Sequence, residues 1–331
     1  MFITILDKEY DITITKELFL NNNFLLKVPK SIISLVNLKE LYLQNNNLTG
    51  LSKSIGLLTK LEKLYLNKNN LTSLPESIGK LVNLQTLYLY NNNLTILPES
   101  IGKLVNLTNL NLHNNKLTKL PESIGKLVNL QILNLCYNNL ITLPESIGFL
   151  TNLQTLVLYN NKLTILPESI VSLVNLRLLY LFDNNLKTIS ESIKLFTNLP
   201  ELYFQNNNLK SLPESIGLLT NLKKLNLTNN NLKSLPESIG LLTKLTNLDL
   251  TNNNLTIISK TMISLLKIDI LYLNDSSYDI NNLDIECEIL ILTHIDNKIG
   301  NLPYTLKKVY LKKNINSDIL KLPYGCEIIY F

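Results

Sequence analysis

The stretch LQTLYLYNNNLTILPESIGKLVN, from Leu84 to Asn106, recurs along the chain with small changes and a constant period of 23. Self-similarity at a fixed period of this length is typical of proteins built from one stacked structural unit. A weaker copy begins at Ile268 and an entry copy at Thr15. The leucine that opens each full unit stands at Leu38, Leu61, Leu84, Leu107, Leu130, Leu153, Leu176, Leu199, Leu222 and Leu245.

The first half of the unit alternates between apolar and exposed positions. Leu87 and Leu89 fall on one side of an extended chain and Tyr88 on the other, which predicts a short strand with one buried face. The segment LPESIGKL follows, in which Pro98 precedes Glu99 and we expect Gly102 to lie after one short helical or 3₁₀ turn. Successive strands must run parallel, since a return segment separates them. One unit cannot bury its apolar side alone, so the units stack around a shared core.

This wording, LPESIGKLxNLxxLxLxxNxLT, resembles the leucine-rich repeat superfamily in its 23-residue class, over roughly residues 15 to 278. It is most similar to the intracellular Ras-group-related and Ras-suppressor-type leucine-rich repeat proteins. The resemblance implies an α/β fold: a curved, horseshoe-like leucine-rich repeat solenoid. In that fold roughly 15 parallel strands line the concave face, and short helical or 3₁₀ turns line the convex face.

The repeats also predict how the chain is organised. Residues 1–14 are expected to form an N-terminal capping hairpin or strand, in which FITIL pairs with DITIT. Residues 15–278 contain twelve 23-residue repeats. Residues 279–331 contain shorter 19–20-residue repeats that end in a terminal strand. We expect the three parts to form one continuous domain.

An asparagine occupies one position in every unit, where the strand passes into the loop. A carboxamide both donates and accepts hydrogen bonds, so this column is predicted to satisfy backbone groups that the turn leaves open. Its role is therefore structural. Asn23 opens the column, and the asparagine ladder proper comprises Asn46, Asn69, Asn92, Asn115, Asn138, Asn161, Asn184, Asn207, Asn230 and Asn253.

Aromatic residues gather at the strand positions that face solvent on the expected concave side. Tyrosine offers a large rigid contact with one polar tip, which favours protein recognition. An alternative is that tyrosine merely suits exposed strand positions. The seventh repeat departs from the consensus at Phe182 and Asp183, which indicates either function or drift. The candidate partner-binding residues are Tyr65, Tyr88, Tyr90, His113, Tyr137, Tyr159, Tyr180, Phe182, Asp183 and Tyr203.

Composition bears on which classes of partner and which location are expected. The net charge of +5 comes from scattered lysines, which does not favour a nucleic-acid partner. No apolar run approaches the roughly 18 residues of a membrane span, and no signal peptide is recognisable, so we expect no membrane partner. Three cysteines in 331 residues indicate a reducing, cytoplasmic location.

No catalytic, cofactor or metal motif stands out. His113 and His294 are far apart in sequence. Cys136 and His113 stand one period apart and should come within about 5 Å, but nothing suggests an oxyanion hole. We therefore expect no enzyme activity, no cofactor, no metal and no small-molecule substrate.

The leading hypothesis is a non-catalytic scaffold whose concave face binds a protein or peptide, with a signalling protein implied by the resemblance. Two alternatives remain open. The chain is a self-assembling structural protein that pairs through the terminal strand CEIIYF, or the recognition subunit of an enzyme complex. We expect a monomer, with a dimer through the C-terminal edge as the alternative.

Overall fold

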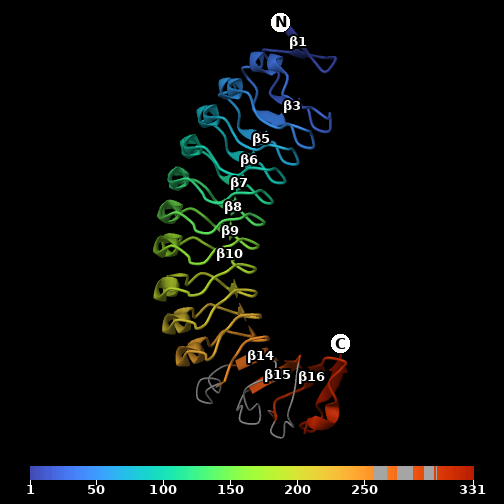
Figure 1. Ribbon diagram of the computed structural model, residues 1–331, viewed down its shortest axis with the longest axis vertical. Helices are drawn as coiled ribbons and strands as arrows, with labels where there is room; N and C mark the ends of the chain where they lie inside the picture. Colours follow the sequence, from blue (N-terminus) through green and yellow to red (C-terminus); the bar gives the residue numbers. More distant parts are fainter. Residues whose placement is uncertain (257–266, 274–285, 294–301, 303) are drawn as a thin grey trace. The chain divides into compact units, whose positions relative to one another are not determined.

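The computed structural model describes residues 1–256, 267–273, 286–293, 302 and 304–331. The chain divides into two compact units. Unit 1 comprises Met1–Leu163 and Pro167–Leu176, and unit 2 comprises Thr164–Leu166 and Arg177–Phe331. Figure 1 traces both, with strands labelled along the chain. The expected division at residues 278 and 279 lies outside the described residues.

Each repeat of unit 1 forms a three-residue strand and a five-residue 3₁₀ turn. The alternation of apolar and exposed positions predicted the strand, and burial confirms it. Leu84, Leu87 and Leu89 are completely buried, while Tyr88 and Tyr90 lie half-buried on the other side. The strands are β3 (Glu17–Phe19), β4 (Glu40–Tyr42), β5 (Lys63–Tyr65), β6 (Thr86–Tyr88), β7 (Asn109–Asn111), β8 (Ile132–Asn134) and β9 (Thr155–Val157). The turns are η1 (Lys30–Ser34), η2 (Lys53–Leu57), η3 (Glu76–Lys80), η4 (Glu99–Lys103), η5 (Glu122–Lys126), η6 (Glu145–Phe149) and η7 (Glu168–Ser172).

Neighbouring strands of unit 1 pair in parallel, always one period apart. Leu64 lies opposite Leu87, and Leu87 lies opposite Leu110. Equivalent residues therefore stand side by side in columns, and the buried leucines form a continuous core. The parallel strands and 3₁₀ turns confirm the predicted leucine-rich repeat fold class.

Unit 2 has the same plan, but the interval between paired residues shortens near the end. Lys224 lies opposite Asn247, a full period away. Lys308 lies opposite Glu327, which is a shorter interval. The strands of unit 2 are β10 (Leu178–Tyr180), β11 (Glu201–Tyr203), β12 (Lys224–Asn226), β13 (Asn247–Asp249), β14 (Lys267–Leu273), β15 (Glu286–Leu292), β16 (Lys308–Leu311) and β17 (Glu327–Tyr330). Its described turns are η8 (Glu191–Leu195), η9 (Glu214–Leu218), η10 (Glu237–Leu241) and η12 (Ser317–Ile319).

The chain begins with an antiparallel hairpin of β1 (Phe2–Ile5) and β2 (Lys8–Asp11). The second strand is thus Lys8–Asp11 rather than the segment DITIT. The turn is tighter than the sequence suggests, because Leu6 and Asp7 both adopt positive φ, at 48° and 60°. Ile5 is buried, with 2% of its surface exposed.

The asparagine ladder is buried and hydrogen bonded to three backbone groups at once. In a typical member, the Asn138 Nδ2 group donates to the carbonyls of Leu112 and Leu135, each at 3.0 Å. Its Oδ1 atom accepts from the backbone N–H of Leu117 at 3.0 Å. The ladder residues are only 5–8% exposed. The carboxamide thus joins its own strand to the preceding repeat. Asn23 differs, since its Nδ2 group donates only to Asn21 within its own loop.

The glycine of the PESIG motif lies inside the 3₁₀ turn rather than after it. Gly125 is the fourth residue of η5, and it packs against η6 of the next repeat. A Cβ atom on Gly125 would lie 2.4 Å from the backbone oxygen of Ser146 and 2.7 Å from its Cβ atom. Close stacking of the turns, rather than an unusual φ, therefore requires glycine here.

Replacement of Asn138 by alanine is expected to destabilise the protein by roughly 1–3 kcal/mol, because buried backbone groups lose their partners. Urea denaturation followed by circular dichroism measures this change. The matched control is Asn139→Lys, since lysine already occupies that column at Lys116 and Lys162. The control should change stability by less than about 0.5 kcal/mol. Equal midpoints for both variants would disprove the structural role of the ladder.

Replacement of Gly125 by alanine is expected to destabilise the protein by about 1–3 kcal/mol, because the added methyl group overlaps the neighbouring turn. Gly50→Ala serves as the control, since nothing lies within 4 Å of a Cβ atom there. Thermal unfolding of the two variants side by side distinguishes them. A Gly125 variant as stable as the Gly50 variant would show that the turns can separate without cost.

Candidate protein-binding surface

Because the strands of unit 1 pair in register, side chains at equivalent solvent-facing positions are aligned in columns. Tyr65 stands between Tyr42 and Tyr88 because β4, β5 and β6 pair one period apart. Two residues further along each repeat, Tyr90 and His113 begin a second column. Neighbouring parallel strands are about 4.8 Å apart, so rings in a column must touch.

These side chains form a continuous chain of ring contacts in unit 1, which we call the aromatic band. Tyr42 and Tyr65 stack with centroids 4.7 Å apart, and Tyr65 meets Tyr88 edge-on at 5.3 Å. Further along, Tyr137 contacts both His113 and Tyr159 edge-on at 5.4 Å. The band comprises Phe19, Tyr42, Tyr65, Tyr88, Tyr90, His113, Tyr137 and Tyr159.

Phe19 was not among the candidates from the sequence, although it stacks on Tyr42 at 4.5 Å. The signal was present, because Phe19 precedes Tyr42 by one full period of the repeat. It lies in the entry copy, where the leucine pattern is incomplete. Phe19 is 56% exposed, so it continues the surface rather than the core.

Unit 2 brings three of the predicted residues together. Tyr180 contacts Phe182 at 6.2 Å and Tyr203 at 5.6 Å between ring centroids. Asp183 is engaged elsewhere, because its Oδ1 atom accepts a hydrogen bond from Asn206 at 2.5 Å. The aromatic cluster of unit 2 therefore consists of Tyr180, Phe182 and Tyr203.

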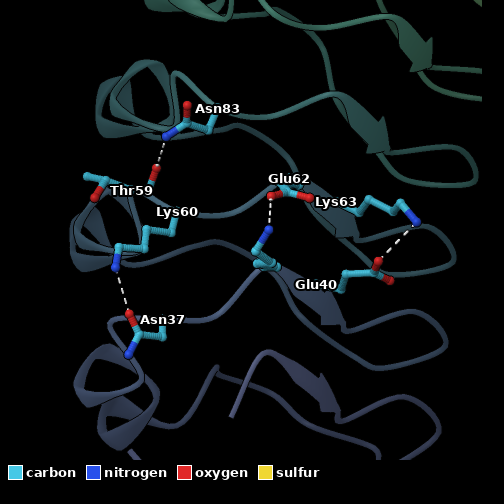
Figure 2. Close-up of polar contacts among 8 residues, drawn as sticks. Asn37, Glu40, Thr59, Lys60, Glu62, Lys63 and Asn83 are labelled. Carbon is cyan, nitrogen blue, oxygen red and sulfur yellow. Dashed lines mark hydrogen bonds and ion pairs between the residues drawn. The ribbon is translucent and has the colours of Figure 1, made fainter. Parts of the chain in front are cut away.

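A polar contact fixes one tyrosine ring in each unit. The Tyr42 hydroxyl donates to Glu40 at 2.5 Å. Lys63 forms an ion pair with the same carboxylate at 2.9 Å, which Figure 2 shows. Tyr203, Glu201 and Lys224 repeat this arrangement, with an ion pair of 2.9 Å. Burial and the Glu201 hydrogen bond raise the pKa of Tyr203 to about 12. The phenol therefore stays neutral at physiological pH.

The structure places Cys136 beside His113, as expected, with Sγ 3.0 Å from Nδ1. The thiol also contacts Asn134 Oδ1 at 3.0 Å. Burial raises the pKa of Cys136, and burial lowers the pKa of His113. Both groups are therefore neutral near pH 7, whereas a nucleophilic cysteine needs the thiolate form. This pair is a polar contact within the aromatic band.

No three histidine, cysteine, aspartate or glutamate side chains approach closely enough to hold a metal ion within the described part of the chain. Among those same residues, no helix has the length and apolar character to cross a bilayer. His294 lies outside the described residues.

Comparison with known proteins identifies the repeat. Residues 64–137 match the family described as leucine-rich repeat region. Residues 15–71, 128–186, 197–255 and 220–277 match the family described as leucine rich repeat. No curated protein matches the sequence.

Several solved structures share the fold. The leucine-rich repeat protein LIC12759 of Leptospira interrogans is 35% identical, with a TM-score of 0.53, over 80% of this chain and 79% of that one. The PEPR1–AtPEP1 structure is 26% identical, with a TM-score of 0.64, over 91% of this chain and 54% of that one. The leucine-rich repeat domain of APL1B shows the fold at 19% identity and a TM-score of 0.66, over 96% and 94% of the two chains. The chain belongs to the leucine-rich repeat family.

Proposed function

We propose that this chain is a non-catalytic scaffold that binds a protein or peptide through the aromatic band of unit 1. The observation that carries the proposal is the unbroken series of ring contacts from Phe19 to Tyr159. Leucine-rich repeat proteins generally mediate protein–protein binding, and this surface concentrates the residue type that most often dominates such interfaces.

Mutual contact among the rings reduces the entropy that binding would cost. Each ring is held by its neighbours before a partner arrives, so little side-chain freedom remains to be lost. Burial raises the pKa of Tyr159 to about 12, so its hydroxyl group stays protonated. The aromatic band therefore presents apolar ring surface together with neutral hydroxyl groups. This suits a partner surface that is partly apolar and partly polar.

The backbone conformation of Tyr137 also supports a role in recognition. It is 45% exposed and adopts φ of 52°, a left-handed conformation that asparagine tolerates better than tyrosine. The same position holds Asn91, Asn114 and Asn160 in neighbouring repeats, with φ between 52° and 56°. A ring at this position is thus disfavoured by the backbone, which supports a role in recognition.

The aromatic cluster of unit 2, Tyr180, Phe182 and Tyr203, is proposed to contribute to the same recognition function. We further propose a signalling protein as the partner and the cytoplasm as the location. Similarity of the LPESIGKL wording to Ras-suppressor-type repeats supports the partner class. The three free cysteines, Cys136, Cys287 and Cys326, support a reducing compartment.

The double substitution Tyr88→Asn with Tyr137→Asn tests the proposal. Asparagine already occupies both columns, at Asn111 and Asn114, so the fold should tolerate it. Partners that wild-type protein captures from native lysate would be identified by mass spectrometry, and their affinity then measured with purified components. The double variant should bind at least about 30-fold more weakly, as expected for interface hot spots of about 2 kcal/mol, with a melting temperature that is not lowered.

Val105→Thr with Val128→Thr is the control. Both valines are exposed, at 43% and 45%, and Thr151 occupies the same column one repeat later. These valines lie on the turn side, away from the aromatic band, so the control should bind as wild type does. Full affinity of the tyrosine double variant for every captured partner would refute the proposed surface.

A further inference from the structure

A polar groove lies between the strands and the 3₁₀ turns of unit 1, on a different face from the aromatic band. Its volume is about 780 Å³. Lys60 and Glu62 line one end, and amide side chains line the remainder. We call it the carboxamide groove, and its turn-side wall is formed by Asn83, Asn106, Asn129 and Asn152.

Each of these four asparagines is oriented by one backbone hydrogen bond. Asn83 donates from Nδ2 to the carbonyl of Thr59 at 2.9 Å, which Figure 2 shows. The next three donate in the same way to Val82, Val105 and Val128, at 2.8–2.9 Å. The amide nitrogen is therefore engaged within the fold. The four Oδ1 atoms accept no hydrogen bond from the described part of the chain, so they form a row of open acceptors.

The chain itself shows what such an acceptor binds. Asn37 makes the same backbone bond, to Thr13 at 2.8 Å, and its Oδ1 atom accepts from the Lys60 ammonium group at 2.6 Å (Figure 2). In unit 2, Lys244 donates to Asn221 Oδ1 at 2.7 Å. Lysine occupies the asparagine column at these two places and reaches back one repeat. An ammonium group thus fits the acceptor wherever the chain supplies one.

The charged side chains that line the groove lie at one end and are Lys39, Lys60 and Glu62, which together carry one net positive charge. Lys39 is paired with Glu62 at 2.5 Å, so the charge at that end is partly offset. Turns η3, η4 and η5 each carry one glutamate and one lysine. Turns η6 and η7 carry Glu145 and Glu168 without a basic residue in the last turn. None of these turn residues lines the groove, and the lining from Asn83 to Asn152 is uncharged, so repulsion of a cation is confined to the Lys60 end.

The spacing between successive acceptors indicates which conformation of a partner peptide can present several ammonium groups in a row. Neighbouring strands of the sheet lie about 4.8 Å apart, and side chains on one face of an extended peptide recur only about every 6.7 Å. One turn of an α-helix rises about 5.4 Å, so residues at i and i+3 or i+4 nearly match the row. A helix with one lysine per turn therefore stays in step with the acceptors over several repeats.

We propose that the carboxamide groove binds a lysine stripe on a partner helix, with ammonium groups donating to Oδ1 of Asn83, Asn106, Asn129 and Asn152. Each contact alone is weak, because the acceptors are neutral and solvent-exposed. Several contacts made by one rigid helix add through effective concentration. This site is independent of the aromatic band, and either one can exist without the other.

The test uses the full chain and a labelled helical peptide with four lysines, one per turn, on a single face. An isomeric peptide of identical composition has its lysines spread around the helix. Fluorescence anisotropy should show at least tenfold tighter binding of the striped peptide. Acetylation of its lysines removes the charge and should abolish binding. Equal binding of the two isomers, or persistence after acetylation, would overturn the proposal.

The Lys60–Asn37 contact suggests a substitution that would block the acceptors of the carboxamide groove. In Asn106→Lys with Asn152→Lys, the new ammonium groups should cover Asn83 and Asn129 as Lys60 covers Asn37, and binding of the striped peptide should fall at least tenfold. The control is Asn45→Lys with Asn160→Lys, which adds equal charge at exposed positions of a column that already holds Lys68. Similar loss in both variants would indicate general charge repulsion and would also overturn the proposal.

Discussion

The buried carboxamides of the asparagine ladder hold each repeat to the one before it, and the other features depend on that register. One side chain accepts from a backbone N–H and donates to carbonyls of two successive repeats, as Asn92 does with Leu71, Leu66 and Leu89. A slip by a single residue would leave these groups unpaired in an apolar interior, which is costly. The strands therefore pair one period apart, and equivalent residues of successive repeats become spatial neighbours.

The columns of equivalent side chains then determine which chemical groups each face presents. On the strand side the columns collect tyrosine, and rings about one strand spacing apart restrain one another. On the groove side they collect asparagine, and each carboxamide is oriented by the backbone of the preceding repeat. Neither face carries a cluster of metal ligands among the described residues. The same register thus produces two recognition surfaces of different chemistry, one aromatic and one amide-rich.

Period and alternation were enough to predict the strands, the short turns and the asparagine ladder, because burial of the leucines permits one register only. They also predicted that Cys136 and His113 would meet. Ring geometry could not be predicted, since Tyr65 stacks on Tyr42 but meets Tyr88 edge-on, and side-chain rotamers decide between the two. The groove was missed because the sequence does not show which end of the Asn83 amide faces the backbone. The glycine of the PESIG motif, as at Gly102, was placed after its turn because its close approach to the next turn, such as that of Gly125 to Ser146, is visible only in three dimensions.

The asparagine column opens with Asn23, whose side chain does not join two repeats, and this has a dynamic consequence. The Asn23 side chain donates only within its own loop, and Asn23 reaches the next repeat through its backbone N–H, which donates to Asn46 Oδ1 at 3.0 Å. Later members tie two repeats together through their own side chains. Stacked repeats contact only their neighbours, so opening one of them removes support from the next. Amide hydrogen exchange should therefore form a gradient, fastest near the entry repeat and slower towards the middle of unit 1, in place of a single global opening. The aromatic band spans that gradient, so its Phe19 end belongs to the part of unit 1 that opens most often.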